Sequence, residues 1–385
     1  MRVAMVDPSL FTLPYDATLS RALTGAGCDV TLHTRSLQAN DGAAGGINMS
    51  QEFYRFAEQR WVRAMPKPLR LAIKAIDHAA SMHKLWRTLK NTRPDIIHFQ
   101  WLPLPILDGR LLGRFRRLAP LVLTVHDTDP FNGDPAASLQ RLGVYDALAG
   151  FNRLIVHTTQ GHARLIAQGL PENRLELLPH GIPTLLDARP DPMQGELTVL
   201  LFGKIKPYKG ADLLVNAFAA LPEALRCQAR LRIVGRPYMD LAPLRAQVQA
   251  SPAADRISIE PDFVADEALP ALLGPGTIMV FPYREIEASG VLYQALEYGR
   301  PIIASRIGAF ADILQDGVHG RLVPPGDTRA LSAALANLIG DRNAAAASAD
   351  AVRLLTRHGP GWDDVAQKTV AIYRSAIAAG EAVLF

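Results

Sequence analysis

Cysteine is scarce in this sequence of 385 residues, which holds only Cys28 and Cys227. Two distant cysteines offer neither a disulfide framework nor the paired spacing of a structural zinc site. The spacing of the histidines and acidic residues also gives no set of metal ligands. We therefore expect a protein of a reducing compartment that requires no metal.

Long apolar runs are missing as well. No uninterrupted run reaches the roughly 18–20 residues that a membrane-spanning helix needs. The N-terminal stretch MRVAMVDPSL is interrupted at Asp7 and Pro8, which makes it too short for a signal peptide. We expect a cytoplasmic protein, with at most peripheral contact with the inner face of the cell membrane.

Three common cofactor and catalytic motifs are absent. The loop after the first apolar run, Val3–Val6, lacks the G-x-G-x-x-G of dinucleotide-binding proteins and carries Pro8 and Pro14 instead. No Gly-Lys pair is followed by Ser or Thr as in a P-loop, and no G-x-S-x-G elbow indicates a hydrolase. We therefore expect no bound cofactor.

The sequence does contain a regular alternation of apolar runs and segments of helical spacing. This alternation predicts parallel sheets with helices on both faces, and the length favours two such domains. The stretch 183–196 holds three prolines and little apolar pattern, which is typical of a linker. We expect domains at 1–185 and 197–361, a linker at 186–196, and a final helix at 362–385 that packs back toward the first domain.

The expected strands are Val3–Val6, Asp29–Thr34, Pro94–Trp101, Pro120–Asp127, Arg153–Thr159, Leu175–Ile182, Thr198–Gly203, Arg230–Gly235, Arg256–Phe263, Thr277–Phe281, Ile302–Ala304 and Gly320–Asp327. Residues 36–50 are polar and rich in glycine, which predicts a loop.

Positive charge is concentrated in the first half of the chain. Residues 1–190 carry 22 Lys and Arg against 16 Asp and Glu, or +6, whereas the remainder carries 19 against 21, or −2. Within residues 51–93, ten basic side chains stand against three acidic ones, interleaved with five aromatic residues. A helical hairpin with a solvated charged face explains this pattern, and so does a patch for an anionic membrane surface. No nucleic-acid-binding motif accompanies the charge, so we expect no nucleic acid partner.

The stretch Phe281–Ala304 has the pattern of a ligand-binding unit. A strand end leads into a charged loop, and Ser289-Gly290 then opens a helix that stops at Gly299. In α/β proteins the loop after a strand and the following helix start face the ligand crevice. Unpaired backbone N–H groups at a helix start favour an anion such as a phosphate.

A second candidate, GKIKPYKG at Gly203–Gly210, also runs from a strand end to a helix start. Gly203 permits close approach of the backbone, and Lys204 and Lys209 offer two positive charges to one diphosphate; the alternative is that both lysines are solvated. Polar side chains also follow several strands of the first half, His126 among them. A histidine there can bind a substrate hydroxyl or accept a proton, or serve a purely structural role.

Taken in order, these stretches resemble the family-4 retaining glycosyltransferases of the GT-B architecture. GKIKPYKG is similar to the family's G-R-x-x-x-x-K-G diphosphate loop, and EASGVLYQALEYGRPIIAS is similar to its E-x₇-E segment. TVHD, LLPHGI and the terminal W-D-x-x-A resemble further family patterns, and residues 36–93 resemble the family least. The resemblance implies an α/β fold of two Rossmann-like, doubly wound domains that face each other across a cleft.

The resemblance also implies that the second domain binds a nucleotide diphosphate sugar without a metal. Lys204, where the family has arginine, and Lys209 would neutralise the leaving diphosphate, Glu287 would lie by the donor sugar, and His126 would approach it from the first domain. The remaining implied donor residues are Gly203, Arg236, Phe263, Ser289, Gly290, Val291 and Gln294, and the implied acceptor-side residues are Tyr15 and Asp16. For several of these, including Tyr15, Arg236 and Phe263, a purely structural role is the alternative.

One position departs from the family pattern. The place of the second glutamate falls on Gln294, which can bind a ribose hydroxyl without charge, and we expect Glu297 to be a solvated helix residue. The resemblance implies hexose transfer, with retention, to a saccharide or lipid-linked saccharide in cell-envelope or exopolysaccharide biosynthesis. The alternatives are another GT-B enzyme, such as a sugar-nucleotide epimerase, and an inactive sugar-nucleotide-binding protein.

Overall fold

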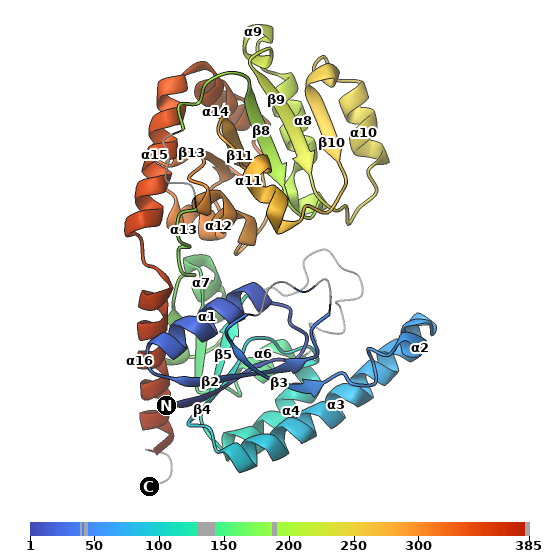
Figure 1. Cartoon of the computed structure of the whole chain (residues 1–385), viewed down its shortest axis with the longest axis vertical. Helices are drawn as coiled ribbons and strands as arrows, with labels where there is room; N and C mark the ends of the chain where they lie inside the picture. The colour runs from blue at the N-terminus through green and yellow to red at the C-terminus, as the bar shows by residue number, and fades with distance from the viewer. Residues whose placement is uncertain (39–40, 42–44, 129–142, 187–190, 382–385) are drawn as a thin grey trace. The chain divides into compact units, whose positions relative to one another are not determined.

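The computed structural model describes residues 1–38, 41, 45–128, 143–186 and 191–381. The chain forms two compact units (Figure 1). Unit 1 comprises Met1–Gly181 and Trp362–Phe385, and unit 2 comprises Ile182–Gly361. The chain therefore leaves unit 1 once and returns to it through its last helix.

Unit 1 is built on a seven-stranded parallel sheet with the order β3-β2-β1-β4-β5-β6-β7. Its elements are β1 (Arg2–Asp7), α1 (Leu13–Gly25), β2 (Asp29–Arg35), β3 (Asn48–Phe53), α2 (Arg60–Arg63), α3 (Lys67–Thr92), β4 (Ile96–Phe99), α4 (Pro105–Arg116), β5 (Leu121–Val125), α6 (Val144–Leu148), β6 (Arg153–Val156), α7 (Thr159–Ala167), η2 (Glu172–Arg174), β7 (Leu175–Leu177) and α16 (Trp362–Glu381).

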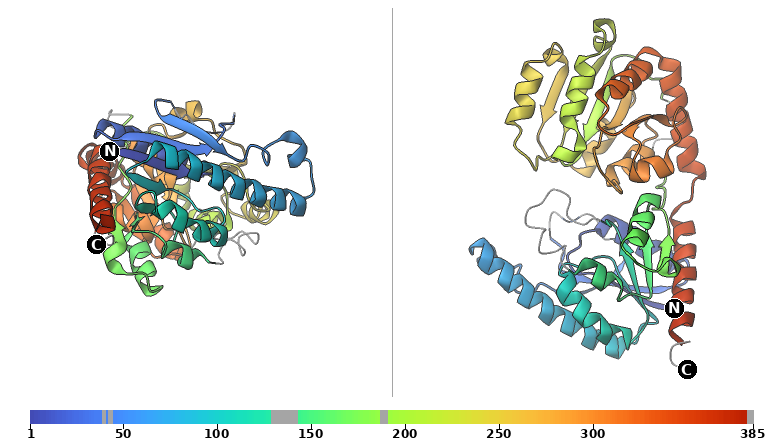
Figure 2. Two further views of the ribbon diagram at one scale, coloured as in Figure 1. Left: turned by 90° about the horizontal axis from the view of Figure 1, so that it is seen from below. Right: turned by 180° about the vertical axis from the view of Figure 1, so that it is seen from behind.

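Helices cover both faces of this sheet (Figures 1 and 2). The apolar sides of α1 and α16 pack on one face, and those of α3, α4 and α6 pack on the other. Strands buried on both faces are mostly apolar, as in the fully buried β5, where Thr124 is the one polar residue. The order of the strands reverses between β1 and β4, and a reversal of this kind opens a ligand crevice at the carboxyl ends of the two strands.

Unit 2 contains a six-stranded parallel sheet with the order β10-β9-β8-β11-β12-β13. Its elements are β8 (Leu197–Phe202), η3 (Pro207–Lys209), α8 (Ala211–Ala219), α9 (Glu223–Arg226), β9 (Ala229–Val234), α10 (Ala242–Gln249), η4 (Ala254–Arg256), β10 (Ile257–Glu260), η5 (Asp266–Ala268), α11 (Leu269–Leu272), β11 (Thr277–Phe281), α12 (Gly290–Glu297), β12 (Ile302–Ser305), α13 (Gly308–Ile313), β13 (Gly320–Val323), α14 (Thr328–Gly340) and α15 (Arg342–His358).

The two faces of this second sheet are covered by different helices. The core on one face takes side chains from α8, α10 and α14, and the core on the other takes them from α11, α12 and α13. The strand order reverses between β8 and β11. Both units therefore have the doubly wound, Rossmann-like architecture expected from the sequence.

The segment 36–93 differs most from its sequence-based description. Residues 48–50, the end of the expected loop, belong to the edge strand β3, and residues 67–92 form one long helix and not a hairpin of two. The strand is polar (NMSQEF) and buries only its last residues, so it lacks the apolar alternation by which strands are recognised. Among the described residues, no helix, α3 included, is long and apolar enough to cross a membrane.

Part of the expected linker is a packed part of unit 2. The buried Asp191 carboxylate accepts hydrogen bonds from Arg300 Nη1 at 2.5 Å and from the Gly276 backbone N–H at 2.9 Å. Met193 lies fully buried in the core next to α8. A buried carboxylate is stable only with such partners, and a proline-rich composition does not reveal them. Residues 187–190 lie outside the described part of the chain.

Candidate functional site

The loop after β8 brings a glycine and a buried lysine together in unit 2. Gly203 adopts φ +102°, and a Cβ there would lie 2.9 Å from Val291 Cγ2 and 3.2 Å from Lys209 Nζ. Because β8 and β11 are neighbours at the reversal of the strand order, the loop after β8 lies against the start of α12. The structure thus places three of the predicted donor residues, Gly203, Lys209 and Val291, in direct proximity.

Lys209 is a buried cation without an acidic partner among the described residues. Burial lowers the pKa of its ammonium group to about 8. Its Nζ lies 5.0 Å from the ring centroid of the buried Tyr283, whose π face attracts a cation. A buried positive charge beside a helix start is suited to an anion.

Three further cations surround one exposed tyrosine, Tyr238. Lys204 Nζ, Lys206 Nζ and Arg236 Cζ lie 5.7, 5.9 and 6.0 Å from its ring centroid. Backbone bonds bring these residues together: the Ile205 N–H donates to Arg236 O, and the Tyr238 N–H donates to Ile205 O, each at 2.9 Å. Sequence reasoning found Lys204 and Arg236 but missed Lys206 and Tyr238. Lys206 lies two residues after Lys204, and Tyr238 lies two residues after Arg236. This spacing points to a shared cluster once β8 and β9 are known to pair.

Gly235, at the end of β9, lets the two strand ends approach each other closely. It adopts φ +138°, and a Cβ there would lie only 2.1 Å from Gly203 O. No other residue can occupy this position without moving the backbone. The basic cluster after β8 and β9 therefore depends on a pair of glycines.

The loop after β11 is clamped at Glu287. The Glu287 side chain is buried, and its carbonyl oxygen accepts a hydrogen bond of 2.7 Å from the Ala309 N–H in α13. Gly308 allows this contact, since a Cβ there would lie 2.5 Å from Glu287 O. The clamp fixes Glu287 shortly before the first turn of α12.

The start of α12 is open. Ser289 is the N-cap residue, and its side chain makes no capping hydrogen bond. Gly290 is exposed, and a Cβ at this position would meet no atom within 4 Å. The glycine is therefore not required by packing within the described protein, and the first N–H groups of the helix remain available to an anion.

Gln294 and Glu297 lie further along α12, and both are half-buried. Burial, and secondarily the charge of Asp266, raises the pKa of Glu297. The expectation of a solvated Glu297 is therefore wrong, because its side chain is half-buried. Phe263 follows the edge strand β10, and its side chain is 79% exposed.

In unit 1, Tyr15 lies at the centre of an aromatic cluster. Its ring centroid is 4.7 Å from that of His126 and 5.1 Å from those of His157 and His180. Trp362, the first residue of α16, lies 5.2 Å away. The structure thus joins the predicted pair Tyr15 and His126, and it adds His157 and His180, which belong to the segments Arg153–Thr159 and Leu175–Ile182 that were expected as strands.

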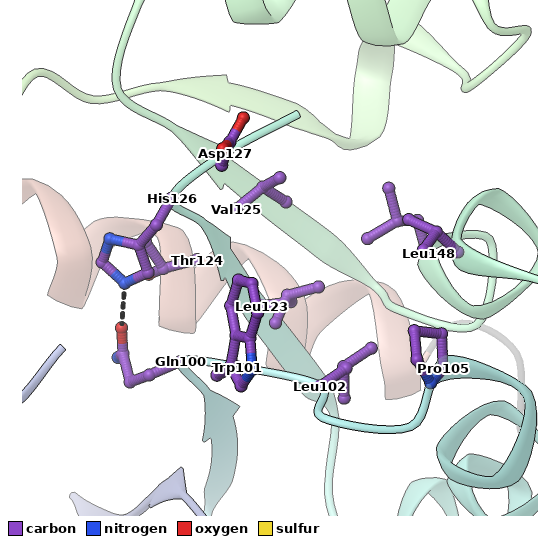
Figure 3. A pocket seen from close by; sticks show the side chains of 11 residues that line it. Gln100, Trp101, Leu102, Pro105, Leu123, Thr124, Val125, His126, Asp127 and Leu148 are labelled. Atoms are coloured by element: carbon purple, nitrogen blue, oxygen red, sulfur yellow. Dashed lines mark hydrogen bonds between the residues drawn. The ribbon is translucent and has the colours of Figure 1, made fainter. Parts of the chain in front are cut away.

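The histidines of this cluster are uncharged at neutral pH. Burial, with a smaller contribution from neighbouring imidazoles, lowers the pKa of His126 and brings that of His180 to about 3. His126 Nε2 lies 3.2 Å from Gln100 Oε1, so this nitrogen carries the proton and donates it (Figure 3). His157 Nδ1 donates to Leu178 O at 2.9 Å, and its buried Nε2 has no partner in the described structure. Neutral imidazoles of this kind accept hydrogen bonds from hydroxyl groups.

Asp16, which the resemblance implies as an acceptor-side residue, lies in the first turn of α1, where Pro14 favours an early helix start. Its carboxyl group is fully buried; Oδ2 accepts from Thr12 Oγ1 at 3.1 Å, and Oδ1 has no partner in the described structure. Burial, followed by the nearby Asp7, raises the pKa of Asp16. A protonated Asp16 would be a hydrogen-bond donor at the carboxyl end of β1.

Within the described ranges, no group of three or more His, Cys, Asp or Glu side chains is arranged to hold a metal ion. The side chains described above offer anion binding in unit 2 and neutral hydrogen bonding to hydroxyl groups in unit 1.

Comparison with known proteins shows what this arrangement belongs to. Residues 17–185 match the family "Glycosyltransferase Family 4", and residues 196–341 match "Glycosyl transferases group 1". The D-inositol 3-phosphate glycosyltransferase of Acidothermus cellulolyticus is 26% identical over 94% of this chain and 85% of its own. The phosphatidyl-myo-inositol mannosyltransferase of Mycobacterium leprae is 32% identical over 48% of each chain.

Solved structures agree at the level of the fold. Anabaena HepE, determined with UDP and glucose, superposes with a TM-score of 0.71 over 97% of this chain and 100% of its own, at 17% identity. WaaG, a glycosyltransferase involved in lipopolysaccharide biosynthesis, superposes with a TM-score of 0.68 over 96% of this chain and 99% of its own, at 16% identity. Two successive family matches and these structural neighbours lead to one conclusion: the chain belongs to the family-4 glycosyltransferases and has the GT-B fold.

Proposed function

We propose that this glycosyltransferase moves a hexose from a nucleoside diphosphate sugar to a hydroxyl of a saccharide or lipid-linked saccharide, with retention at the anomeric carbon. The observation that supports the donor class is the buried Lys209, which has no acidic partner among the described residues and lies beside the open start of α12. A diphosphate leaving group gains negative charge as the glycosidic bond breaks, and a fixed cation stabilises that charge in the transition state. We place the reaction in cell-envelope or exopolysaccharide biosynthesis.

The donor residues would bind the substrate in two ways, through positive charge and through hydrogen bonds. Lys209 and Lys204 would neutralise the diphosphate, and the N–H groups of Gly290 and Val291 would bind its oxygens. Glu287, held by α13, would bind hydroxyls of the sugar, and the amide of Gln294 would bind the ribose. No metal ion is needed in this scheme, because cations of the chain balance the charge.

The acceptor residues are proposed to be those of the unit 1 cluster. His126 and Tyr15 would bind the acceptor or sugar hydroxyls as neutral groups. The acceptor oxygen forms the new bond to the anomeric carbon, and its proton leaves with the phosphate oxygen or to solvent. The names of two relatives point to inositol phosphates or phosphatidylinositol as their acceptors, which makes these compounds members of any acceptor screen.

The proposal is tested with purified protein and radiolabelled UDP- and GDP-sugars, with hydrolysis and transfer both measured. Product stereochemistry is then read by NMR, and an α-linked product from an α-linked donor supports retention. Absence of binding and turnover across the panel would overturn the proposal, and an inverted product or an epimerised donor would establish one of the alternative reactions. Gln294→Glu, which restores the family residue, tests whether a neutral amide there limits turnover.

We also propose that residues 51–93 contact an anionic membrane surface. The segment places exposed apolar side chains beside its basic residues: Phe56 (66% exposed), Trp61 (58%), Leu69, Leu71 and Ile76 (72%). In unit 1, α2 and the start of α3 extend beyond the edge of the sheet (Figures 1 and 2). Exposed aromatic and aliphatic groups among Lys and Arg are typical of helices that lie at a lipid interface.

A further inference from the structure

A chain of polar contacts runs through unit 1 from α16 to His126. The Tyr373 hydroxyl lies 2.7 Å from His98 Nδ1, and His98 Nε2 lies 2.8 Å from Thr124 Oγ1. The Gln100 amide nitrogen lies 3.4 and 3.3 Å from the same two ring nitrogens, and Gln100 Oε1 lies 3.2 Å from His126 Nε2 (Figure 3). Every member of this chain is buried except His126, which is half-buried.

His98 is uncharged, so only one of its ring nitrogens carries a proton. Burial, with a smaller contribution from His157, lowers the pKa of His98 to about 3. Burial also raises the pKa of the Tyr373 hydroxyl, which therefore keeps its proton. Because a phenol is a stronger donor than an aliphatic hydroxyl, Tyr373 donates to Nδ1, and Nε2–H donates to Thr124. Both nitrogens of His98 thus have a partner in the plane of the ring.

This arrangement determines how the Gln100 amide is turned. Its nitrogen is almost equally far from the two nitrogens of His98, whose in-plane positions are occupied, so it lies over the face of the ring. The face of an aromatic ring is electron-rich and attracts an N–H group, whereas it repels a carbonyl oxygen. The amide oxygen is therefore the atom that Gln100 presents to His126.

The amide oxygen in turn fixes the proton of His126. A carbonyl oxygen can only accept a hydrogen bond, so Nε2 carries the proton of this neutral imidazole. Nδ1 then holds the free electron pair, and it has no hydrogen-bond partner among the described residues. Figure 3 shows this second nitrogen turned away from the apolar side chains, on the side of the ring opposite to them.

We propose that Gln100 is a positioning residue of the transfer reaction: it holds His126 in the Nε2–H tautomer, so that Nδ1 accepts a hydrogen bond from a substrate hydroxyl. Gln100 acts through His126 and not on the substrate itself. The inference rests on the proposed function, because it takes His126 as a residue that binds hydroxyl groups. It also defines the ligand group at Nδ1, which has to be a hydrogen-bond donor.

The tautomer is measured directly in the full chain without any ligand. Isotopically labelled histidine gives the shifts of both ring nitrogens in long-range proton–nitrogen correlation spectra, and the His126→Asn variant identifies the signals of His126. At neutral pH the unchanged protein should show a protonated Nε2 and a bare Nδ1. A bare Nε2 with a protonated Nδ1 would overturn the proposal, and this measurement does not depend on the folding of any Gln100 variant.

Two substitutions of Gln100 should affect His126 differently. Gln100→Leu removes the acceptor at similar side-chain volume, so the Nδ1–H tautomer should become populated. Gln100→Glu keeps an accepting oxygen, so Nε2 should stay protonated. A Gln100→Leu protein in which His126 remains wholly in the Nε2–H form would show that another group fixes the tautomer, and the proposed role of Gln100 would be lost.

Ser81→Ala is the matched control. Ser81 lies buried in α3, where its hydroxyl accepts the Tyr54 N–H at 3.3 Å, and it is no member of the chain that ends at His126. The alanine variant also loses a buried hydrogen bond of unit 1, but the tautomer of His126 should not change. An equal shift of the tautomer in Ser81→Ala and Gln100→Leu would reduce the effect to a general loosening of unit 1 and overturn the proposal.

Turnover of UDP- and GDP-sugars by the same variants separates this inference from the proposed function. Gln100→Leu should lower kcat/KM by roughly three- to tenfold, as the loss of one oriented hydrogen bond does, while the affinity for UDP, whose proposed site lies in unit 2, stays the same. Turnover that is equal in Gln100→Leu and Ser81→Ala would keep the reaction and overturn the role of Gln100. A tautomer that responds to Gln100 in a protein without any turnover would instead remove the proposed reaction and leave a histidine oriented for a hydroxyl ligand.

Discussion

Lys209 couples the donor site to pH. The ammonium form binds a diphosphate, whereas burial favours the neutral amine and brings the pKa to about 8. Affinity for a nucleoside diphosphate should therefore be constant near pH 7 and fall as the pH rises through about 8, by at most roughly tenfold per pH unit. Calorimetry between pH 7 and 9.5, above the phosphate pKa of about 6, measures this.

The control for this prediction is the other lysine of the loop. Lys209→Met should bind weakly and lose the change near pH 8, whereas Lys204→Met should bind weakly and retain it, because Lys204 is exposed. The same pH dependence in the Lys209→Met variant would show that another group titrates.

Two glycines of the site should respond differently to alanine. Gly290→Ala meets no neighbour within 4 Å, so the free energy of unfolding should stay the same or rise by up to about 1 kcal/mol. The new methyl group would occupy the space of a phosphate, so the donor KM should rise roughly tenfold or more. Thermal unfolding and initial rates measure both effects.

Gly235→Ala provides the contrast. Its Cβ would lie 2.1 Å from Gly203 O at φ +138°, and we expect a loss of roughly 3 kcal/mol of stability. A stable Gly235→Ala, or a Gly290→Ala variant with an unchanged donor KM, would contradict the roles given to these two positions.

Single residues could be predicted where a local motif specifies them. Gly203 and Lys209 belong to one short loop, and the structure brings them together as the sequence suggested. Tyr238 and His157 could not be found this way, because their significance comes from neighbours on other strands. Gln294 and Glu297 show the limit of prediction within one helix. Their spacing predicts the turn of the helix on which each lies, but not how deeply its side chain is buried.

At the scale of elements, the long helix α3 is anchored by buried polar contacts. Asp77 accepts hydrogen bonds from the N–H groups of Phe56 and Ala57 at 2.9 and 2.7 Å. His78 bonds Asp108 Oδ1 of α4 at 2.7 Å and the Tyr54 hydroxyl at 2.9 Å. These contacts hold the helix to the sheet, and its other face carries the exposed basic and apolar groups.

Membrane binding is tested at this element. Arg55, Arg60 and Arg70 are exposed, and a polybasic surface gains about 1 kcal/mol per residue on an anionic bilayer. Replacement of all three by Glu should weaken co-sedimentation with phosphatidylserine-containing vesicles by roughly 100-fold or more. The same change at the exposed Arg110, Arg114 and Arg117 of the α4 region serves as control, and equal losses from both triples would refute a specific patch.

Most strands could be predicted because buried parallel strands are continuous apolar runs, as β5 and β11 show. The polar edge strand β3 could not, since it is stabilised by pairing with β2 and by a buried end at Phe53. The same limitation applies to Asp191, whose burial depends on an arginine more than a hundred residues away.

At the scale of the whole molecule, α16 completes unit 1. The Tyr373 hydroxyl lies 2.7 Å from His98 Nδ1, and Arg153 Nη2 donates to Ser375 Oγ at 2.6 Å. Tyr373→Phe removes a buried hydrogen bond and should cost unit 1 about 1–3 kcal/mol. Unfolding followed with and without UDP, which is expected to stabilise unit 2, assigns the transition.

Tyr298→Phe is the matched control, because the Tyr298 hydroxyl has no hydrogen-bond partner among the described residues. It should leave both transitions within about 0.5 kcal/mol of those of the unchanged protein. A Tyr373→Phe variant that behaves in the same way would show that the helix is held by its apolar side alone.

The return of α16 has a consequence for synthesis on the ribosome. All of unit 2 is translated before Val365, Ala366 and Tyr373, which belong to the core that covers one face of the first sheet. The nascent chain therefore carries a partly bare apolar sheet while a complete second unit emerges and folds behind it. A chaperone that shields that face during elongation would act on unit 1, and its release would coincide with the synthesis of α16.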